Sequence, residues 1–205
     1  MHGNYCKEWQ SARVNFILSK YPKEFFQGKT VLELAPFNGH IGAEFDKLGA
    51  SVTYIEGRIE NVEYIQKTFP HIPVIHADLD TPTWEWGDFD IILNFGVLYH
   101  LEHYHKEFLT NSILHSKLLF LESVIYDSSE NELFFRNEQG LDQSLTNRAG
   151  NPSTSYVESI LDSYEVRYTK YTSSELNGGG HTYDWVDSNS KTLHPFHRRF
   201  WIVGD

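Results

Sequence analysis

Short apolar runs alternate with amphipathic segments along most of the chain. Apolar residues that recur every three or four positions indicate one face of a helix, whereas continuous apolar runs indicate strands buried on both faces. The pattern predicts helices before Pro22 and at residues 40–48, 59–69, 102–115 and 151–162. It predicts strands at residues 30–35, 51–55, 72–76, 89–95, 117–124, 164–168 and 199–203.

The alternation of strands with helices between residues 30 and 124 indicates βαβ units. Such units form a parallel sheet with helices on both faces, wound by right-handed crossovers. Ligands of these sheets bind at the carboxyl ends of the strands, so we expect functional residues directly after each strand. A polar stretch with Asn177-Gly-Gly-Gly180, between the last two predicted strands, is expected to be a loop.

Polar residues follow the first four predicted strands. Glu33 precedes a turn that contains Gly39, and Glu56, Asp78 and Asn94 come at the ends of the next three strands. The Glu56 carboxylate offers two acceptor oxygens in one plane, which suits the two hydroxyls of a ribose. A carboxylate at Asp78 can accept a hydrogen bond from an exocyclic amine such as that of adenine. Together, these strand ends predict a binding site at one edge of the sheet.

Composition and charge narrow the class of protein. The 205 residues, 40% of them hydrophobic, are enough for a core without a disulfide or metal, so we expect one domain at residues 1–205. A net charge of −11 disfavours nucleic acid as a partner and favours a small molecule. The single cysteine, Cys6, the polar N-terminal segment and the absence of a long apolar run predict a cytoplasmic protein that does not cross a membrane. The oligomeric state stays open.

Four stretches of the chain resemble class I S-adenosylmethionine-dependent methyltransferases. The matching stretches are Val31–Gly39, Tyr54–Gly57, Ala77-Asp78 and Asp88–Leu101. Within the last, Gly96-Val-Leu-Tyr-His-Leu101 is similar to the small-molecule and tRNA-wobble-uridine branches of that superfamily. The resemblance implies a doubly wound, Rossmann-like α/β fold, a three-layer sandwich with a seven-stranded, mostly parallel sheet. The implied strand order is 3-2-1-4-5-7-6, with strand 7 antiparallel.

The resemblance also implies a function and a separate role for each part of the chain. The cofactor would be S-adenosylmethionine, and the reaction a methyl transfer to oxygen or nitrogen of a small polar acceptor. A helical cover at residues 1–27, a cofactor-binding half at 28–125 and a substrate-side half at 126–205 are implied. Glu33 would lie near the methionine amino group, Glu56 would hold the ribose, and Asp78 would read adenine. The implied cofactor-binding residues are Glu33, Ala35, Pro36, Phe37, Asn38, Gly39, Glu56, Gly57, Arg58, Asp78, Leu79, Asn94, Phe95 and Gly96.

The turn after the first strand departs from the family pattern. The usual Gly-x-Gly-x-Gly reads Ala35-Pro-Phe-Asn-Gly39, so two of the three glycines are replaced. We expect the Phe37 ring to point away from the cofactor. The missing glycines also argue against a dinucleotide site, which needs Gly-x-Gly-x-x-Gly for the pyrophosphate.

A hydroxyl or amine acceptor must lose a proton, and histidine is the side chain best suited to take it near neutral pH. His100 follows the fourth strand and is predicted to be the general base or a substrate-orienting group, with a helix cap as the alternative. Tyr99 is predicted to line the path of the methyl group. The spacing of His100, His103 and His105 matches no recognised ligand pattern, so no metal is predicted.

The acceptor is expected to meet a polar, partly cationic pocket built mainly by the C-terminal third. The alternative is a solvated loop with a structural pair of arginines. Two further functions stay open: an S-adenosylmethionine-binding module without catalysis, motivated by the altered glycine turn, and a tRNA-modifying methyltransferase that uses Arg198 and Arg199. The candidate acceptor contacts are His103, Arg148, His181, Tyr183, His197 and Arg198.

Overall fold

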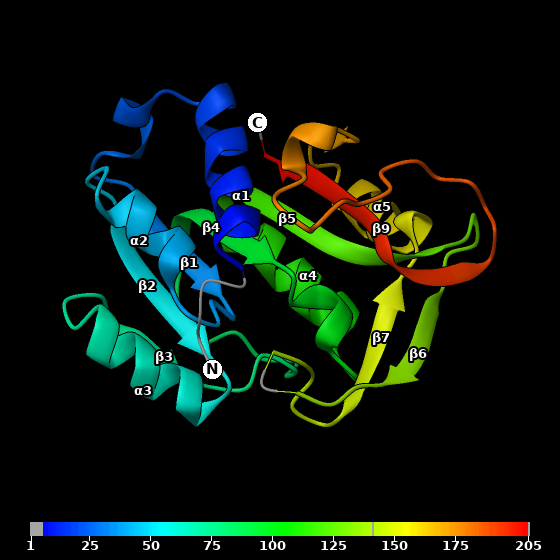
Figure 1. The fold of residues 1–205 in the computed structure, drawn as a ribbon, viewed down its shortest axis with the longest axis horizontal. Helices are drawn as coiled ribbons and strands as arrows, with labels where there is room; N and C mark the ends of the chain where they lie inside the picture. Colours follow the sequence, from blue (N-terminus) through cyan, green and yellow to red (C-terminus); the bar gives the residue numbers. More distant parts are fainter. Residues whose placement is uncertain (1–5, 141, 205) are drawn as a thin grey trace.

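A seven-stranded sheet forms the centre of the molecule (Figure 1). The computed structural model describes residues 6–140 and 142–204. The sheet order is β3-β2-β1-β4-β5-β9-β8, with β9 antiparallel to both of its neighbours, which confirms the order and the antiparallel strand expected from the sequence. The strands are β1 (Thr30–Leu34), β2 (Ser51–Glu56), β3 (Val74–His76), β4 (Phe89–Phe95), β5 (Ser116–Asp127), β8 (Tyr168–Tyr171) and β9 (Thr192–Val203).

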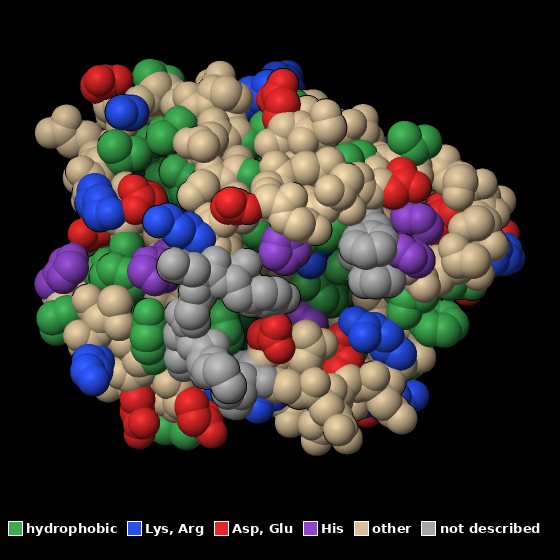
Figure 2. All heavy atoms as spheres, in the orientation of Figure 1, with side chains coloured by type: hydrophobic (Ala, Val, Ile, Leu, Met, Phe, Trp, Pro, Cys, Tyr) green, Lys and Arg blue, Asp and Glu red, His purple; other side chains and the backbone are tan. Residues whose placement is uncertain are grey.

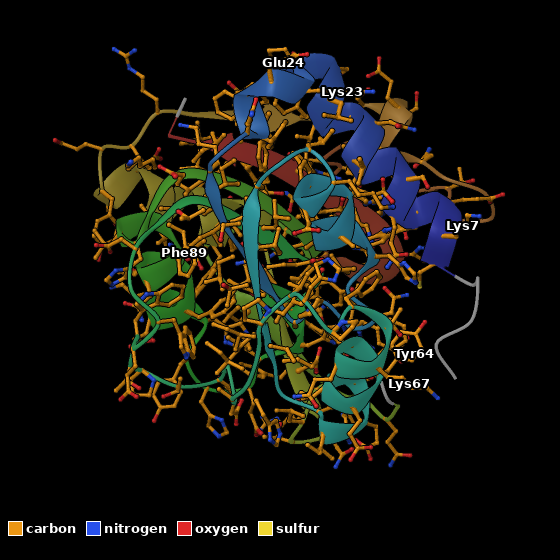
Figure 3. All side chains as sticks on the ribbon, turned by 90° about the vertical axis from the view of Figure 1, so that its left-hand side faces the viewer. Lys7, Lys23, Glu24, Tyr64, Lys67 and Phe89 are labelled. Atoms are coloured by element: carbon orange, nitrogen blue, oxygen red, sulfur yellow. The ribbon has the colours of Figure 1, made fainter. Side chains whose placement is uncertain are left out.

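Helices cover both faces of this sheet. One face carries α1 (Lys7–Lys20), α2 (His40–Asp46) and α3 (Ile59–Thr68), and the other α4 (His105–Leu114) and α5 (Thr154–Ser163). Figure 3 shows α1 with the labelled Lys7 and α3 with Tyr64 on the same side of the sheet. Phe45 of α2 and Leu109 of α4 are fully buried on opposite faces. Each such side chain contributes about 1.5–3 kcal/mol of burial free energy, which holds the three layers together.

The central strands are mostly apolar because both of their faces are covered. Ile91, Ile92 and Leu93 of β4 are at most 1% exposed. Between α2 and β2, Gly49 has a φ of 86°, a left-handed conformation that favours glycine and reverses the chain toward the sheet. The predicted alternation of helix and strand up to residue 124 is therefore observed. Of the expected N-terminal cover at residues 1–27, the structure describes the part from residue 6 onward.

The helix predicted from residue 102 begins instead at His105. The cause is Asp80, in the loop after β3, whose carboxylate accepts hydrogen bonds from three successive backbone N–H groups. These belong to Glu102 (2.9 Å), His103 (3.0 Å) and Tyr104 (2.8 Å). Because a distant carboxylate satisfies these donors outside a helix, the segment after β4 stays irregular for several residues before α4 starts.

The last third of the chain differs most from the prediction. The strand predicted at residues 164–168 lies at β8 instead, because Glu165 takes a left-handed φ of 52° after α5 and turns the chain before it straightens. The strand predicted at 199–203 begins at Thr192, and the one predicted to end at 124 continues to Asp127. These two long strands pair along their added residues, so each supports the extension of the other.

A two-stranded hairpin, β6 (Leu133–Asn137) and β7 (Arg148–Pro152), was not predicted and lies outside the main sheet (Figure 1). Its second strand occupies the start of the predicted 151–162 helix, which begins at Thr154 after the N-cap Ser153. Residues 148–152 include glycine, asparagine and proline, which have poor strand propensity, but pairing with β6 overrides that propensity. The Gly150 N–H donates to the carbonyl of Leu101 (2.7 Å), which ties the hairpin to the segment after β4.

Candidate functional site

A cavity of about 570 Å³ opens at the carboxyl ends of β1, β2 and β4. The loops after these strands form one wall, and α1, the β6–β7 connection and β9 form the others. Figure 2 shows acidic, basic and histidine side chains around a hollow on this face. The predicted residues that line the cavity are Glu33, Ala35, Pro36, Phe37, Glu56, Gly57, Arg58, Asp78, Leu79, Phe95, Gly96, Tyr99, His100, His181, Tyr183 and Arg198.

Six predicted site residues are not brought to the cavity lining. Three of the predicted acceptor contacts have other partners. The ring of His103 bonds to Asp80 (3.0 Å), and the Arg148 guanidinium lies 3.4 Å from Glu102 in an exposed ion pair. His197 lies 3.5 Å from Asp184. These side chains therefore pair with other residues and do not line the cavity. The six residues are Asn38, Gly39, Asn94, His103, Arg148 and His197.

The turn after β1 keeps a left-handed backbone at three alternate positions. The φ angles are 47° at Ala35, 57° at Phe37 and 74° at Gly39, the positions where the family pattern has glycine. A left-handed conformation costs a non-glycine residue about 1–2 kcal/mol. The Phe37 N–H donates to Glu56 (3.1 Å) and the Tyr54 hydroxyl donates to the Gly39 carbonyl (2.7 Å), and these bonds hold the turn. The glycine-type turn is thus retained without two of its glycines.

Glu33 is a buried carboxyl at the base of the cavity. Its Oε2 accepts a hydrogen bond from the Gly42 N–H (2.7 Å). The pKa of Glu33 is raised to about 8, mainly because the carboxyl is buried. The Gly42 hydrogen bond lowers this pKa, and the nearby Glu56 carboxylate raises it further. A carboxyl in this state gains a favourable partner when a cationic group enters the cavity.

Glu56 and Asp78 lie at the ends of β2 and β3, where each carboxylate is oriented by backbone N–H groups. The two oxygens of Glu56 accept bonds from Phe37 (3.1 Å) and Arg58 (2.9 Å). Asp78 accepts the N–H of Asp80 (2.9 Å). Carboxylates fixed in this way keep lone pairs available to hydroxyl or amine donors of a ligand.

His100 forms a close pair with Glu138. Its Nδ1 lies 2.5 Å from Glu138 Oε2, and the Glu138 side chain is fully buried. Glu138 also accepts the Ser144 N–H (3.1 Å) and forms an ion pair with Arg136. Burial alone would raise the pKa of Glu138, but the bond and charge of His100, with Ser144 and Arg136, hold that pKa below its ordinary value. The pair is therefore a histidine oriented by an ionised carboxylate.

Glu138 was missed by the sequence analysis. It follows β6 in a segment with no motif, and no spacing relates it to His100. Tyr99 completes this wall, with its ring centroid 4.1 Å from that of His100.

Arg198 approaches the cavity from β9. It bonds to Glu122 of β5 (2.8 Å) and to the Tyr99 hydroxyl (3.0 Å). Glu122 was also missed by the sequence analysis, because it lies inside an apolar strand where no local pattern marks it. Arg199, the next residue after Arg198, is fully buried and lies outside the cavity. It bonds to Asp187 and to backbone carbonyls, so its role is structural.

The described part of the chain lacks both a metal-binding cluster and a membrane-spanning helix. No three histidine, cysteine, aspartate or glutamate side chains within it are grouped to hold a metal ion. No helix among these residues combines the length and the apolar character that a membrane crossing requires.

The sequence matches no family model and no curated protein. Solved structures match at the level of fold. The N-terminal domain of EvdMO1, crystallised in the presence of SAH and D-fucose, has a TM-score of 0.68 at 17% identity, over 98% of this chain and 83% of that one. An S-adenosylmethionine-dependent methyltransferase from Clostridium acetobutylicum has a TM-score of 0.64 at 12% identity, over 94% of this chain and 90% of that one.

A third match extends the same pattern. Magnesium protoporphyrin IX methyltransferase from Synechocystis, with bound SAM, has a TM-score of 0.61 at 12% identity, over 95% of this chain and 76% of that one. These likenesses span nearly the whole chain. The chain therefore has the fold of the class I S-adenosylmethionine-dependent methyltransferases.

Proposed function

We propose that the protein is an S-adenosylmethionine-dependent methyltransferase that acts on oxygen or nitrogen of a small polar acceptor. The observation that carries this proposal is that His100, paired with the buried Glu138, lines the same cavity as the carboxyls at the ends of β1, β2 and β3. The carboxyls suit a cofactor with an amine, a ribose and an adenine. The pair suits an acceptor that must lose a proton.

The residues at the strand ends fit this cofactor. Glu33, whose pKa is raised to about 8 by burial, would gain a cationic partner in the methionine amino group. Glu56, with both oxygens oriented by backbone N–H groups, would accept the two ribose hydroxyls. Asp78 would accept the exocyclic amine of adenine, next to the N–H of Leu79. Residues 28–125 would thus bind the cofactor and residues 126–205 the acceptor.

When bound, S-adenosylmethionine supplies an activated methyl group. The chain supplies proton removal: His100 donates its Nδ1–H to Glu138, and this tautomer leaves Nε2 as a proton acceptor. Nε2 takes the proton of the acceptor hydroxyl or amine, and the Glu138 carboxylate stabilises the positive charge that forms on the ring. Tyr99 packs against the imidazole and lines the path of the methyl group.

The acceptor class is proposed from the site as a whole. EvdMO1 was crystallised with D-fucose, so sugars belong in the first acceptor panel beside phenols and amines.

The low cysteine content supports a reducing compartment, and we place the activity in the cytoplasm.

Calorimetric titration with S-adenosylmethionine and S-adenosylhomocysteine, with NAD as the control ligand, tests the cofactor. We expect a Kd of order micromolar, about −8 kcal/mol, for the sulfur ligands only. Glu56→Ala should weaken binding by at least about tenfold, since hydrogen bonds to a charged group contribute about 1.5–3 kcal/mol. Glu60→Ala, an exposed carboxylate on α3, is the matched control.

Turnover is then measured as S-adenosylhomocysteine formed with each acceptor. Formation that is lost in His100→Ala supports the proposal. Wild-type protein that binds neither sulfur ligand contradicts it. Binding without product from any acceptor supports the module without catalysis instead.

A further inference from the structure

Two buried arginines share one carboxylate oxygen behind the acceptor side of the cavity. Glu122 Oε1 accepts from Arg13 of α1 (2.7 Å) and from Arg198 of β9 (2.8 Å). Arg13 and Glu122 are fully buried, and Arg198 is 8% exposed. Arg13 is held from behind by the carbonyls of Trp9 (3.1 Å) and Leu176 (2.5 Å), whereas Arg198 lines the cavity.

This arrangement leaves a positive charge without its own counter-charge. Among the described residues, Glu122 is the only carboxylate in a salt bridge with Arg198, and it already neutralises Arg13. The Nε of Arg198 is buried and has no hydrogen-bond partner within the described part of the chain. A buried guanidinium that shares its only counter-charge is unfavourable in the protein alone, so an anion that enters the cavity relieves part of that cost.

Four of the five other acidic residues of the cavity accept backbone N–H groups near the ends of the strands. Glu33 and Glu56 accept backbone N–H groups beside the turn after β1, and Asp78 and Asp80 accept backbone N–H groups near the end of β3. Asp142 lies exposed on the β6–β7 connection. None of them forms a salt bridge with Arg198 in the described structure, so an anionic ligand can supply the missing counter-charge.

We propose that Arg198 binds a carboxylate of the methyl acceptor, so that the enzyme acts on the hydroxyl or amine of a small carboxylic acid. The methyl transfer in this inference rests on the proposed function, whereas the anion site at Arg198 does not depend on it. A carboxylate is favoured over a phosphate because one negative charge matches the one excess positive charge. The planar guanidinium also presents its remaining N–H groups to a planar, two-oxygen partner.

Aromatic rings surround the guanidinium and favour a flat ligand. The Arg198 Cζ lies 4.7 Å from the ring centroid of Tyr183, 5.3 Å from that of Tyr99 and 5.7 Å from that of Trp9. Tyr99 in turn packs against His100, so the anion site and the proton acceptor lie on one continuous wall. An aromatic hydroxy acid of the hydroxybenzoate type fits this combination of charge, rings and base.

The test compares matched acid and amide probes. The three hydroxybenzoate isomers and the corresponding hydroxybenzamides are titrated calorimetrically into wild type, Arg198→Met and Arg198→Lys, each with and without saturating S-adenosylhomocysteine. Arg167→Met, which removes an exposed guanidinium, is the control variant. We expect wild type and the control to bind at least one acid about tenfold or more tighter than its amide, as expected for a charge-assisted pair. Arg198→Met should lose this preference, and Arg198→Lys should retain part of it.

Arg198→Met is expected to fold, because Glu122 keeps its bond to Arg13 and the cluster becomes charge-balanced. Its melting temperature and its S-adenosylhomocysteine affinity should therefore stay close to those of wild type. Should the methionine variant unfold, Arg198→Lys still tests the proposal through a reduced acid preference, because lysine keeps the charge but lacks the planar pair of N–H donors.

Three results would overturn the proposal: equal binding of acid and amide, no binding of any acid at millimolar concentration, or loss of S-adenosylhomocysteine affinity in Arg198→Met with the acid preference intact. The last would mean that Arg198 serves the carboxylate of the cofactor. Failure of the proposed function is a separate observation, since it appears as no binding of either sulfur ligand to wild type. The acid-over-amide preference, measured without cofactor, still decides the role of Arg198 in that case.

Discussion

His100 Nδ1 and Glu138 Oε2 lie 2.5 Å apart, although 38 residues separate them along the chain. The ring comes from the short helical turn after β4, and the carboxylate from the connection after β6. Hydrogen bonds from the hairpin to Leu101 and His105 keep these two segments together. The unpredicted hairpin thereby orients the predicted base.

Glu138→Gln is expected to lower kcat by about 10- to 100-fold. Glutamine can accept the His100 bond but cannot stabilise the charge that forms on the ring. A bond to a charged group contributes about 1.5–3 kcal/mol, and about 1.4 kcal/mol corresponds to tenfold in rate. Steady-state kinetics with the acceptor found by screening, beside calorimetry with S-adenosylhomocysteine, measures the effect.

The Kd of S-adenosylhomocysteine should be unchanged in Glu138→Gln, because Glu138 does not contact the predicted cofactor residues. Glu130→Gln, an exposed carboxylate near the start of the same hairpin, is the control and should keep full kcat. A variant at position 138 with wild-type kcat would show that the pair is structural only.

Cofactor binding should release protons near neutral pH through Glu33. With its pKa raised to about 8, Glu33 is mostly protonated at pH 7 in the free protein, and a bound cationic amine favours the carboxylate. Affinity for S-adenosylhomocysteine should therefore rise as the pH increases from about 6.5 toward 8 and then level off. Calorimetry in buffers of different ionisation enthalpy counts the released protons. Glu33→Gln should abolish the proton release that comes from Glu33. If the variant releases as many protons as wild type, the protons come from another group.

Gly42→Ala is expected to disturb both the fold and cofactor binding. A Cβ at this position would lie 2.5 Å from Tyr54 Cε1 and 2.6 Å from Glu33 Oε2, well inside contact distance. Overpacking of this kind costs about 1–3 kcal/mol, and the displaced Glu33 would weaken the amine site. Thermal unfolding should show a lower melting temperature, by about 2–4 °C for each kcal/mol. Gly180→Ala, where a Cβ would meet nothing within 4 Å, is the control and should unfold like wild type.

Asp80→Asn should destabilise the protein by about 1–3 kcal/mol, since its carboxylate satisfies three backbone N–H groups before α4. Burial alone would raise the pKa of Asp80, but these bonds and the His103 ring hold the pKa below its ordinary value. A lowered carboxyl pKa contributes stability at neutral pH, which is lost as the pH falls through the folded-state pKa. The difference in denaturant stability between wild type and variant should therefore be full at pH 7 and shrink below about pH 4. A difference that stays constant over this range would mean that the charge of Asp80 is not what matters.

The sequence by itself determined the order of the strands in the main sheet and of its covering helices, the edge of the sheet at which the cavity opens, and the carboxyls Glu33, Glu56 and Asp78 at the strand ends. These follow from local periodicity and from the rule that parallel strands place their carboxyl ends together. It also identified His100 and Arg198 as candidates, because each side chain carries the required chemistry in its own right.

Only the tertiary structure decided which partners these groups have. Glu138 reaches His100 through a hairpin whose second strand, β7, is built from residues with poor strand propensity, and Glu122 joins Arg13 to Arg198 across three elements of the fold. The same holds for Asp80, which delays the start of α4 from a distant loop. Such contacts join segments far apart in the chain, and they depend on packing and register that no local spacing encodes. The proposed acceptor chemistry therefore comes from the assembled cavity.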